Sequence, residues 1–201
     1  MPMVFPSSPT VGQVFSSGGR SWVWTGSTWD SPSASTAALS GLTLIADIPF
    51  SGVTTIAADN VFTSNYLNYK VVFNGLHSGS AAAYRVQLRN AGSNITSAYF
   101  YQGNRSIASS LNNLTGNNVS DWIAGYASSG ENIFIDSDVF NPATTGLTGI
   151  GLKSFSFESP SFMCSQIGGQ ERQNLTRDGF RIFASAGTFT GTMKIYGYRN
   201  Q

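Results

Sequence analysis

Strand signals lie about ten residues apart from Gly41 onward, and this spacing constrains the fold of the chain more than any other feature. Residues 84–89 (Tyr-Arg-Val-Gln-Leu-Arg) alternate apolar and polar side chains, which is typical of a strand with one face on a core and one in water. No window longer than one or two turns has apolar residues at helical spacing. The chain is therefore predicted to be all-β. Further strands are expected at residues 42–50, 54–57, 69–74, 98–102, 122–126, 132–140, 148–158, 161–166, 179–185 and 192–199.

Many short strands joined by Gly-rich and Asn-rich turns indicate an antiparallel β-sandwich. A jelly roll is the leading arrangement for roughly ten strands, and an immunoglobulin-like sandwich is second. Residues 181–199 form two alternating runs separated by Ala186-Gly187, so we expect a closing hairpin that stitches the C-terminus into a sheet. The inward apolar set switches near Gly151, which predicts a bulge.

The first thirty residues are unusually aromatic and contain two short β-prone runs separated by a Gly-Gly turn. We expect a small N-terminal β-hairpin module over residues 1–30 that docks onto another protein, because so small a piece needs a partner surface. Residues 31–40 are small and polar and are predicted to be a linker, which leaves residues 41–201 for the sandwich. The expected docking residues are Phe5, Phe15, Trp22, Trp24 and Trp29.

Composition argues against several classes of partner. Charged residues are 10% of the chain and the formal net charge is +1, with the basic residues scattered singly. Nucleic acids and anionic membranes are bound by clustered Lys and Arg, so neither is expected as a partner. The single cysteine, Cys164, allows no internal disulfide, and no signal peptide or membrane-spanning run is indicated. No cofactor motif is present.

Two sets of residues are weighed as catalytic or metal-binding. His77, the one histidine, follows Asn-Gly-Leu in an expected loop, and without a nucleophile elbow it is interpreted as a solvated loop residue. Asp136 and Asp138 should share one strand face and could hold Ca²⁺ or act as a glycosidase pair. Phe134 and Phe140 share that face, so the interpretation favoured is a solvated face without metal or catalysis.

Aromatic rings beside amides suggest a glycan site. Rings stack on the apolar faces of sugars while amides bond the hydroxyls. Residues 104–120 are expected to form a long irregular loop or a frayed strand pair, a place where binding often occurs. The alternative is that the rings fill the core. The glycan-binding candidates are Tyr99, Tyr101, Asn104 and Trp122.

Two segments resemble known virion proteins. Residues 5–13 (Phe-Pro-Ser-Ser-Pro-Thr-Val-Gly-Gln) with residues 22–29 (Trp-Val-Trp-Thr-Gly-Ser-Thr-Trp) resemble a segment near the N-terminus of tailed-bacteriophage fibre and neck-appendage proteins, notably of cyanophages. Residues 187–197 are similar to the closing hairpin of many phage virion structural proteins. These are structural patterns, and they transfer no catalytic residue.

The resemblance implies a non-enzymatic structural protein on the exterior of a phage particle, on the head or the tail. Its partners would be other virion proteins, further copies of itself in a trimer, and host-surface glycan contacted by a projecting sandwich. A capsid decoration protein and a free carbohydrate-binding module are the alternatives. A glycan hydrolase using Asp136 and Asp138 is the weakest of the hypotheses.

Overall fold

The computed structural model describes residues 4–18, 20–30, 41–158 and 160–199. The chain divides into two compact units, one within residues 1–41 and the other within residues 42–200. The predicted linker, residues 31–40, lies outside the described residues. Over the described ranges no helix is long and apolar enough to cross a membrane.

The first unit is an antiparallel three-stranded sheet in the order β1-β2-β3. Its strands are β1 (Val14–Ser17), β2 (Arg20–Trp24) and β3 (Trp29–Asp30). A tight turn joins β2 to β3, in which the Thr25 amide donates a hydrogen bond to the Thr28 carbonyl at 2.9 Å. The turn brings Trp24 opposite Trp29, with their ring centres 5.6 Å apart.

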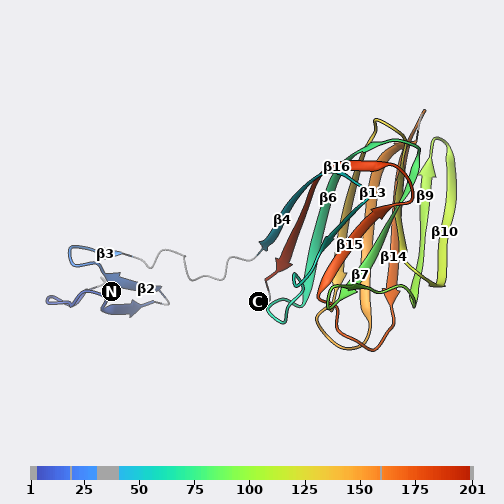
Figure 1. Ribbon diagram of the computed structural model, residues 1–201. Helices are drawn as coiled ribbons and strands as arrows, with labels where there is room; N and C mark the ends of the chain where they lie inside the picture. Colours follow the sequence, from blue (N-terminus) through green and yellow to red (C-terminus); the bar gives the residue numbers. More distant parts are fainter. Residues whose placement is uncertain (1–3, 19, 31–40, 159, 200–201) are drawn as a thin grey trace. The chain divides into compact units, whose positions relative to one another are not determined.

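The second unit is an all-β structure with two antiparallel sheets (Figure 1). In the described residues the larger sheet has eight strands, in the order β10-β9-β14-β13-β12-β6-β16-β4, and the smaller has the order β11-β7-β15-β5, with β8 paired to β7. The larger sheet consists of β4 (Leu42–Val53), β6 (Asn68–Ser78), β9 (Tyr99–Ile107), β10 (Ser110–Val119), β12 (Asn132–Phe140), β13 (Thr148–Glu158), β14 (Ser161–Glu171) and β16 (Thr188–Tyr198). The smaller consists of β5 (Thr55–Ala58), β7 (Ala82–Asn90), β8 (Ser93–Asn94), β11 (Trp122–Ala127) and β15 (Gly179–Ala184).

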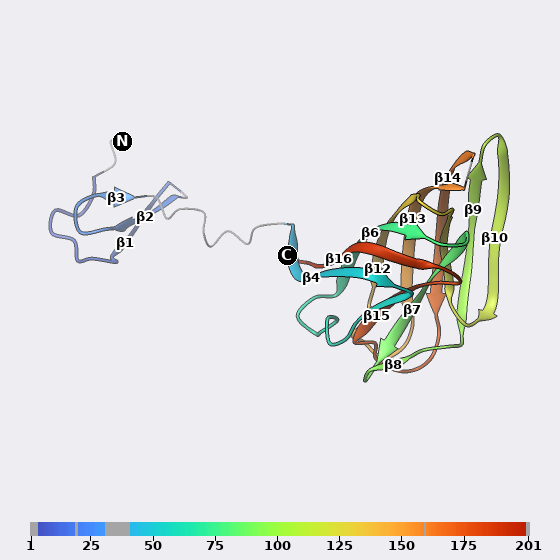
Figure 2. The ribbon, with the colours of Figure 1, turned by 45° about the horizontal axis from the view of Figure 1, so that its top comes forward.

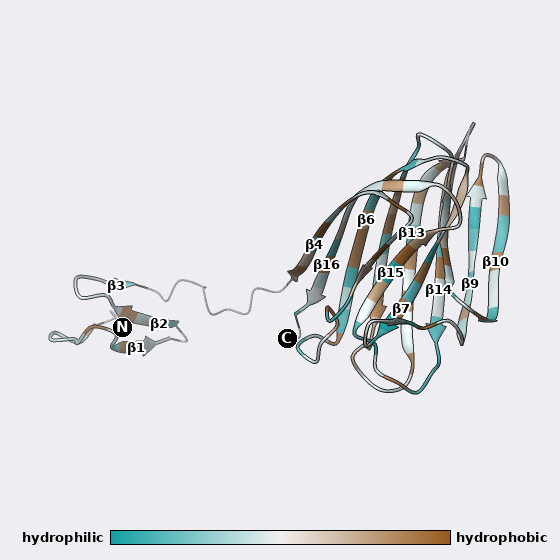
Figure 3. Ribbon diagram, viewed as in Figure 1, coloured by the Kyte–Doolittle hydropathy of each residue, from teal (hydrophilic) through white to brown (hydrophobic). Residues whose placement is uncertain are grey.

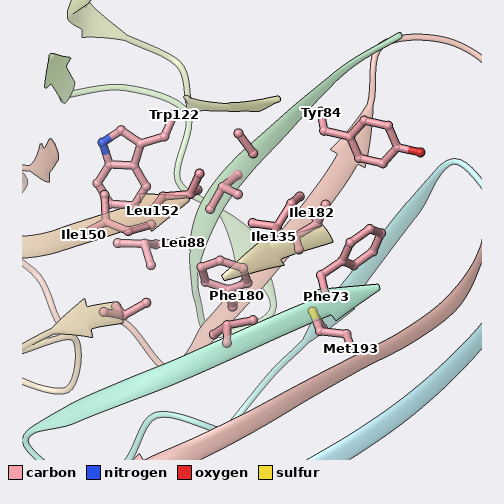
Figure 4. Packing of buried hydrophobic residues seen from close by; sticks show 14 of the residues in the cluster. Phe73, Tyr84, Leu88, Trp122, Ile135, Ile150, Leu152, Phe180, Ile182 and Met193 are labelled. Atoms are coloured by element: carbon pink, nitrogen blue, oxygen red, sulfur yellow. The ribbon is translucent and has the colours of Figure 1, made fainter. Parts of the chain in front are cut away.

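The core lies between the facing sides of these sheets, which confirms the predicted β-sandwich. Figure 4 shows Leu88 and Ile182 of the smaller sheet packed toward Ile135 and Leu152 of the larger. Bands of hydrophilic and hydrophobic residues follow one another along β7 in Figure 3, the alternation expected of a strand with one buried face. Residues of the larger sheet that point away from the smaller one form its outer face.

The connections cross between the sheets at most steps, so strands that are consecutive in sequence usually lie in different layers. Only β9–β10 and β12–β13–β14 pair directly with their neighbours in sequence within the larger sheet. Figures 1 and 2 both place the β9–β10 hairpin at one edge of the sandwich. The jelly-roll assignment itself stays a prediction.

The predicted C-terminal hairpin is wrong, although the C-terminal strand does lie in a sheet. Strand β15 pairs with β5 and β7, whereas β16 pairs with β4 and β6 in the opposite sheet. The Gly187 turn, with φ of +67°, therefore carries the chain across the sandwich instead of folding it back on itself. A short alternating run on each side of a glycine turn fits either geometry, because both strands bury one face.

The predicted bulge near Gly151 is also wrong. The pairing of β13 with β12 and with β14 is continuous along the strand, so Ser154 and Ser156 point inward while Phe155 and Phe157 point outward. Small inward residues are required because β11 crosses closely here. A Cβ on Gly125 of β11 would lie 2.6 Å from the Ser154 hydroxyl.

Residues 104–120 were expected to form a long irregular loop or a frayed strand pair, and the structure has a strand pair. Strand β9 extends to Ile107 and β10 covers Ser110–Val119, with a register irregularity between Gly116 and Val119.

A buried ion pair ties two loops to the end of the β12–β13–β14 meander. Arg177 and Glu171 are both fully buried, and the Arg177 Nε donates to Glu171 Oε2 at 2.6 Å. The remaining guanidinium hydrogens are used as well, so the buried cation leaves no donor unpaired. They go to a second bond with Glu171 and to the carbonyls of Gly146, Gln173 and Leu175.

Removing one partner of this pair should be strongly destabilising. We expect Arg177→Met to lower the free energy of unfolding by about 3–5 kcal/mol, because Glu171 is then left as an unpaired buried charge. The double variant Arg177→Met with Glu171→Leu should recover part of the loss. Urea unfolding monitored by tryptophan fluorescence measures both, and a loss below about 1 kcal/mol, the range of exposed pairs, would contradict the assignment.

Candidate functional site

The outer face of the larger sheet is ordered into cross-strand rows by the continuous register of β12, β13, β14 and β9. Each row holds one outward residue from each strand, and rows are about 7 Å apart along the strands. In order along β12 the rows are Phe134-Phe155-Cys164-Ser106, Asp136-Lys153-Gln166-Asn104, Asp138-Gly151-Gly168-Gln102 and Phe140-Gly149-Gln170-Phe100. The rows pass from apolar to charged to glycine-rich.

A hollow of about 750 Å³ lies over the glycine-rich rows where β14, β9 and β10 meet. Its lining includes amides, a threonine hydroxyl, a valine and two aromatic residues, Phe100 and Tyr101. We call this hollow the trough. The residues that define it are Phe100, Gln102, Thr115, Asn117, Gly168 and Gln170.

Glycines make the trough concave. Gly168 lines the trough, its cross-strand neighbour Gly151 lines a smaller hollow beside it, and a Cβ on Gly168 would meet no atom within 4 Å. Neither glycine has a φ in the left-handed region, so backbone conformation does not require them. The missing side chains leave open space above the sheet, as a binding surface for a ligand would.

Two other glycines serve the packing beneath. A Cβ on Gly169 would lie 2.6 Å from the Trp122 indole nitrogen, and one on Gly116 would lie 2.2 Å from the Tyr101 ring. Trp122 and Tyr101 therefore press against the inner side of the sheet that floors the trough. The backbone beneath the trough is therefore tightly packed against these two rings.

The side chains that line the trough are uncharged, and its amides can form two hydrogen bonds to one ligand. The amides of Gln102, Asn117 and Gln170 each offer both donors and acceptors, which match the hydroxyl pairs of a sugar. The Phe100 ring is half-buried and lies 5.3 Å from the Arg172 guanidinium, which steadies it at the rim. A few polar groups converging on a hollow beside aromatic rings are typical of a small-ligand site.

A smaller hollow of about 190 Å³ adjoins Gly151 and is charged. Lys70 lies between the two predicted carboxylates: it forms an ion pair with Asp136, and its Nζ is 3.6 Å from Asp138 Oδ1. The Tyr198 hydroxyl donates a hydrogen bond to the same Asp138 oxygen. Asp136 and Asp138 do share one face with Phe134 and Phe140, as predicted.

This arrangement does not favour the calcium or glycosidase hypotheses. The Lys70 ammonium group occupies the position between the carboxylates that a cation would take. Among the described residues no three His, Cys, Asp or Glu side chains gather as a metal site would require. The pair is accounted for as a cross-strand ion pair with a tyrosine cap.

Two of the predicted glycan residues lie in the core, so the prediction is wrong for them. Tyr99 and Trp122 are fully buried, and their rings pack edge to face with centres 4.7 Å apart. The Tyr99 hydroxyl donates to the Ile95 carbonyl and accepts from the Leu88 amide, which leaves it nothing for a ligand. Burial accordingly raises the pKa of Tyr99.

The other two predicted glycan residues fall on opposite faces of β9. Tyr101 packs against the core, and burial raises its pKa, but it is also one of the residues that line the trough. Asn104 is exposed on the outer face, one row from Gln102. The prediction chose the inward members of the alternating run 99–102, whereas the outward members, Phe100 and Gln102, also line the hollow.

His77 is not a loop residue, and that interpretation was wrong. It lies in β6 and is fully buried, with Nε2 2.7 Å from the Ser80 carbonyl and Nδ1 3.0 Å from the Tyr84 hydroxyl. A carbonyl only accepts, so Nε2 carries the proton, and Tyr84 can donate to Nδ1. His77 therefore anchors the β6–β7 connection.

The five predicted docking residues come together within the first unit. The Phe5 ring lies 5.0 Å from Phe15, 5.4 Å from Trp22 and 5.3 Å from Trp29, measured between ring centres. All five rings are partly buried, so they form a miniature core with exposed edges.

No known protein-family model matches this chain, and no curated protein shows significant similarity to it.

The tyrosine cap gives a prediction at alkaline pH. Burial, then the hydrogen bond to Asp138, raises the pKa of Tyr198 from 10.0 to about 12. Because the folded value exceeds the unfolded one, the stabilisation from this contact is complete below pH 10.0 and is lost as the pH approaches about 12. Spectrophotometric tyrosine titration of wild type minus Tyr198→Phe should show a component near the raised value. Asp138→Asn should move that component back toward 10.0; if the component does not move, the cap is not the cause.

Proposed function

We propose that this protein is a non-enzymatic structural component of a tailed-phage particle, on the exterior of the head or tail. In this proposal the N-terminal unit docks onto other virion proteins, and the β-sandwich projects as a short fibre or knob. The trough on the outer face contacts host-surface glycan. The resemblance implies a homo-oligomer, a trimer.

The division of the chain into two separate units carries the proposal. The first unit holds its own aromatic cluster around Phe5, and the rings of this cluster are partly exposed. A small module that packs its own rings yet leaves their edges open is suited to docking. Trp anchors of this kind are enriched among the residues that dominate protein interfaces.

The trough supports the glycan part of the proposal. Host-surface polysaccharides are rich in hydroxyl groups, and the amides of Gln102, Asn117 and Gln170 match them. The hollow is an open surface without a buried acid, so it fits binding and not hydrolysis. The same observation also favours the second candidate function, a free carbohydrate-binding module.

Docking is tested by deletion. Phage particles assembled with a chain lacking residues 1–30 should contain none of it, because the aromatic module is gone, while circular dichroism of the purified truncated chain should still show a folded sandwich. Immunogold labelling of the full chain places it on the head or the tail, and head labelling would establish the capsid-decoration alternative. Truncated chain found in particles would refute docking through this module.

Glycan binding is tested on an array of bacterial surface polysaccharides. The double variant Gln102→Ala and Gln170→Ala should bind roughly tenfold more weakly or worse, since it removes two amides worth about 1 kcal/mol each. Asn74→Ala with Thr192→Ala, a cross-strand pair at another part of the outer face, is the matched control and should bind as wild type. Equal binding by both double variants would exclude the trough.

A further inference from the structure

Arg172 places a positive charge at the rim of the trough. It follows Gln170 by two residues and is exposed on the same side of the chain, because Glu171 between them is fully buried. The Arg172 amide donates a hydrogen bond to the Ala98 carbonyl at 3.1 Å, so the pairing of β14 with β9 continues for one more residue. Arg172 therefore lies on the outer face, just beyond the row that holds Gln170 and Phe100.

The Phe100 ring fixes the position of the Arg172 guanidinium. The guanidinium carbon lies over this ring, 5.3 Å from its centre, in a cation–π contact. The second aromatic residue of the trough, Tyr101, packs against the core. Neither ring is thus a free platform for stacking on a sugar, and recognition in the trough must depend more on polar and charged contacts.

Arg172 is also unusual among the arginines of the sandwich, because its guanidinium has no hydrogen-bonded or acidic partner in the described residues. The acid next to it, Glu171, is bound to Arg177. Arg105 shares this lack of a polar partner, but it stacks on the Tyr126 ring on the other face of β9. Polar groups of the protein hold Arg85, Arg89, Arg177, Arg181 and Arg199.

No other charge near the trough offsets that of Arg172. The residues lining the trough are all uncharged. The adjoining smaller hollow carries two lysines and two aspartates, so its charges cancel within the hollow. In that hollow Lys70 contacts both Asp136 and Asp138, and Lys153 lies opposite Asp136 across the strands. The rim at Arg172 is therefore a site of uncompensated positive charge beside a neutral trough.

We propose that the trough takes an acidic polysaccharide, in which Arg172 binds the carboxylate of a uronic acid while the amides of Gln102 and Gln170 bind hydroxyl groups. This inference rests on the proposed glycan-binding function and names the class of glycan. The guanidinium fork matches a carboxylate with two parallel hydrogen bonds. One guanidinium also balances one carboxylate, whereas a phosphate monoester carries a charge of about −1.5 to −2 and would need a second cation.

Binding to acidic polysaccharides before and after carboxyl reduction tests the proposal. Bacterial surface polysaccharides that contain uronic acids are printed on an array, each beside its own carboxyl-reduced form, in which hydroxymethyl groups replace the carboxylates. The full-length protein should bind the acidic form roughly fivefold more tightly than the reduced form, the scale of an exposed ion pair. Raising the salt concentration should reduce this preference, because salt screens exposed charges.

Substitutions at Arg172 show whether this residue causes the preference. Arg172→Gln should bind both forms equally, and Arg172→Lys should keep part of the preference because it keeps the charge without the fork. The matched control is Arg199→Gln, which removes the same charge beyond the end of β16, near the opposite edge of the larger sheet (Figure 1). This control should bind as wild type. Disturbed packing of Phe100 alone would weaken both forms alike and leave their ratio unchanged.

The outcomes separate this inference from the function on which it rests. Equal binding of the acidic and reduced forms by wild type would overturn the inference and leave glycan binding intact. An unchanged ratio in Arg172→Gln would show that Arg172 does not bind the carboxylate. Absence of binding to every polysaccharide in either form would refute the glycan-binding function and this inference with it.

Discussion

The unbroken two-residue alternation of β12, β13 and β14 is the constraint on which both faces of the sandwich depend. Their pairing has no irregularity from one end to the other. A slip of one residue in β13 would bring Phe155 and Phe157 inward, against β11, where only serines fit beside Gly125. The close crossing of β11 therefore fixes the register, and the register sets the outer rows over which the trough lies.

The buried Arg177 holds the end of the same meander against a neighbouring loop. Its guanidinium joins Glu171, at the last position of β14, to the loop that connects β12 with β13. A paired buried charge contributes little net stability compared with an apolar substitute, but it tolerates few alternative arrangements. This pair therefore serves mainly to specify the conformation of the loops at the end of the meander. The positions of the outer-face rows depend in turn on how the meander ends.

The strand positions and the sandwich could be predicted, because a period of two is visible in the sequence wherever one face is buried. Which face is buried could not be assigned where both faces carry rings, so Tyr99 and Tyr101 were preferred to Phe100 and Gln102. Trp122 lies in a strand buried on nearly all sides, which alternation cannot reveal. His77 was predicted to be a solvated loop residue, whereas strand β6 continues past Gly75 and includes it. The partner that buries it, Tyr84, comes from another strand. Long-range pairing, such as β16 with β4, leaves no local signal at all.

The chemistry of the trough implies that one trough binds a ligand weakly. An open hollow lined by amides gains little free energy per sugar, since each hydrogen bond made to a ligand replaces one made to water. Weak sites become useful when several act together, because the second binding event is intramolecular. Several troughs acting together on one assembly would thus supply the binding strength that a neutral, solvent-open sugar site lacks.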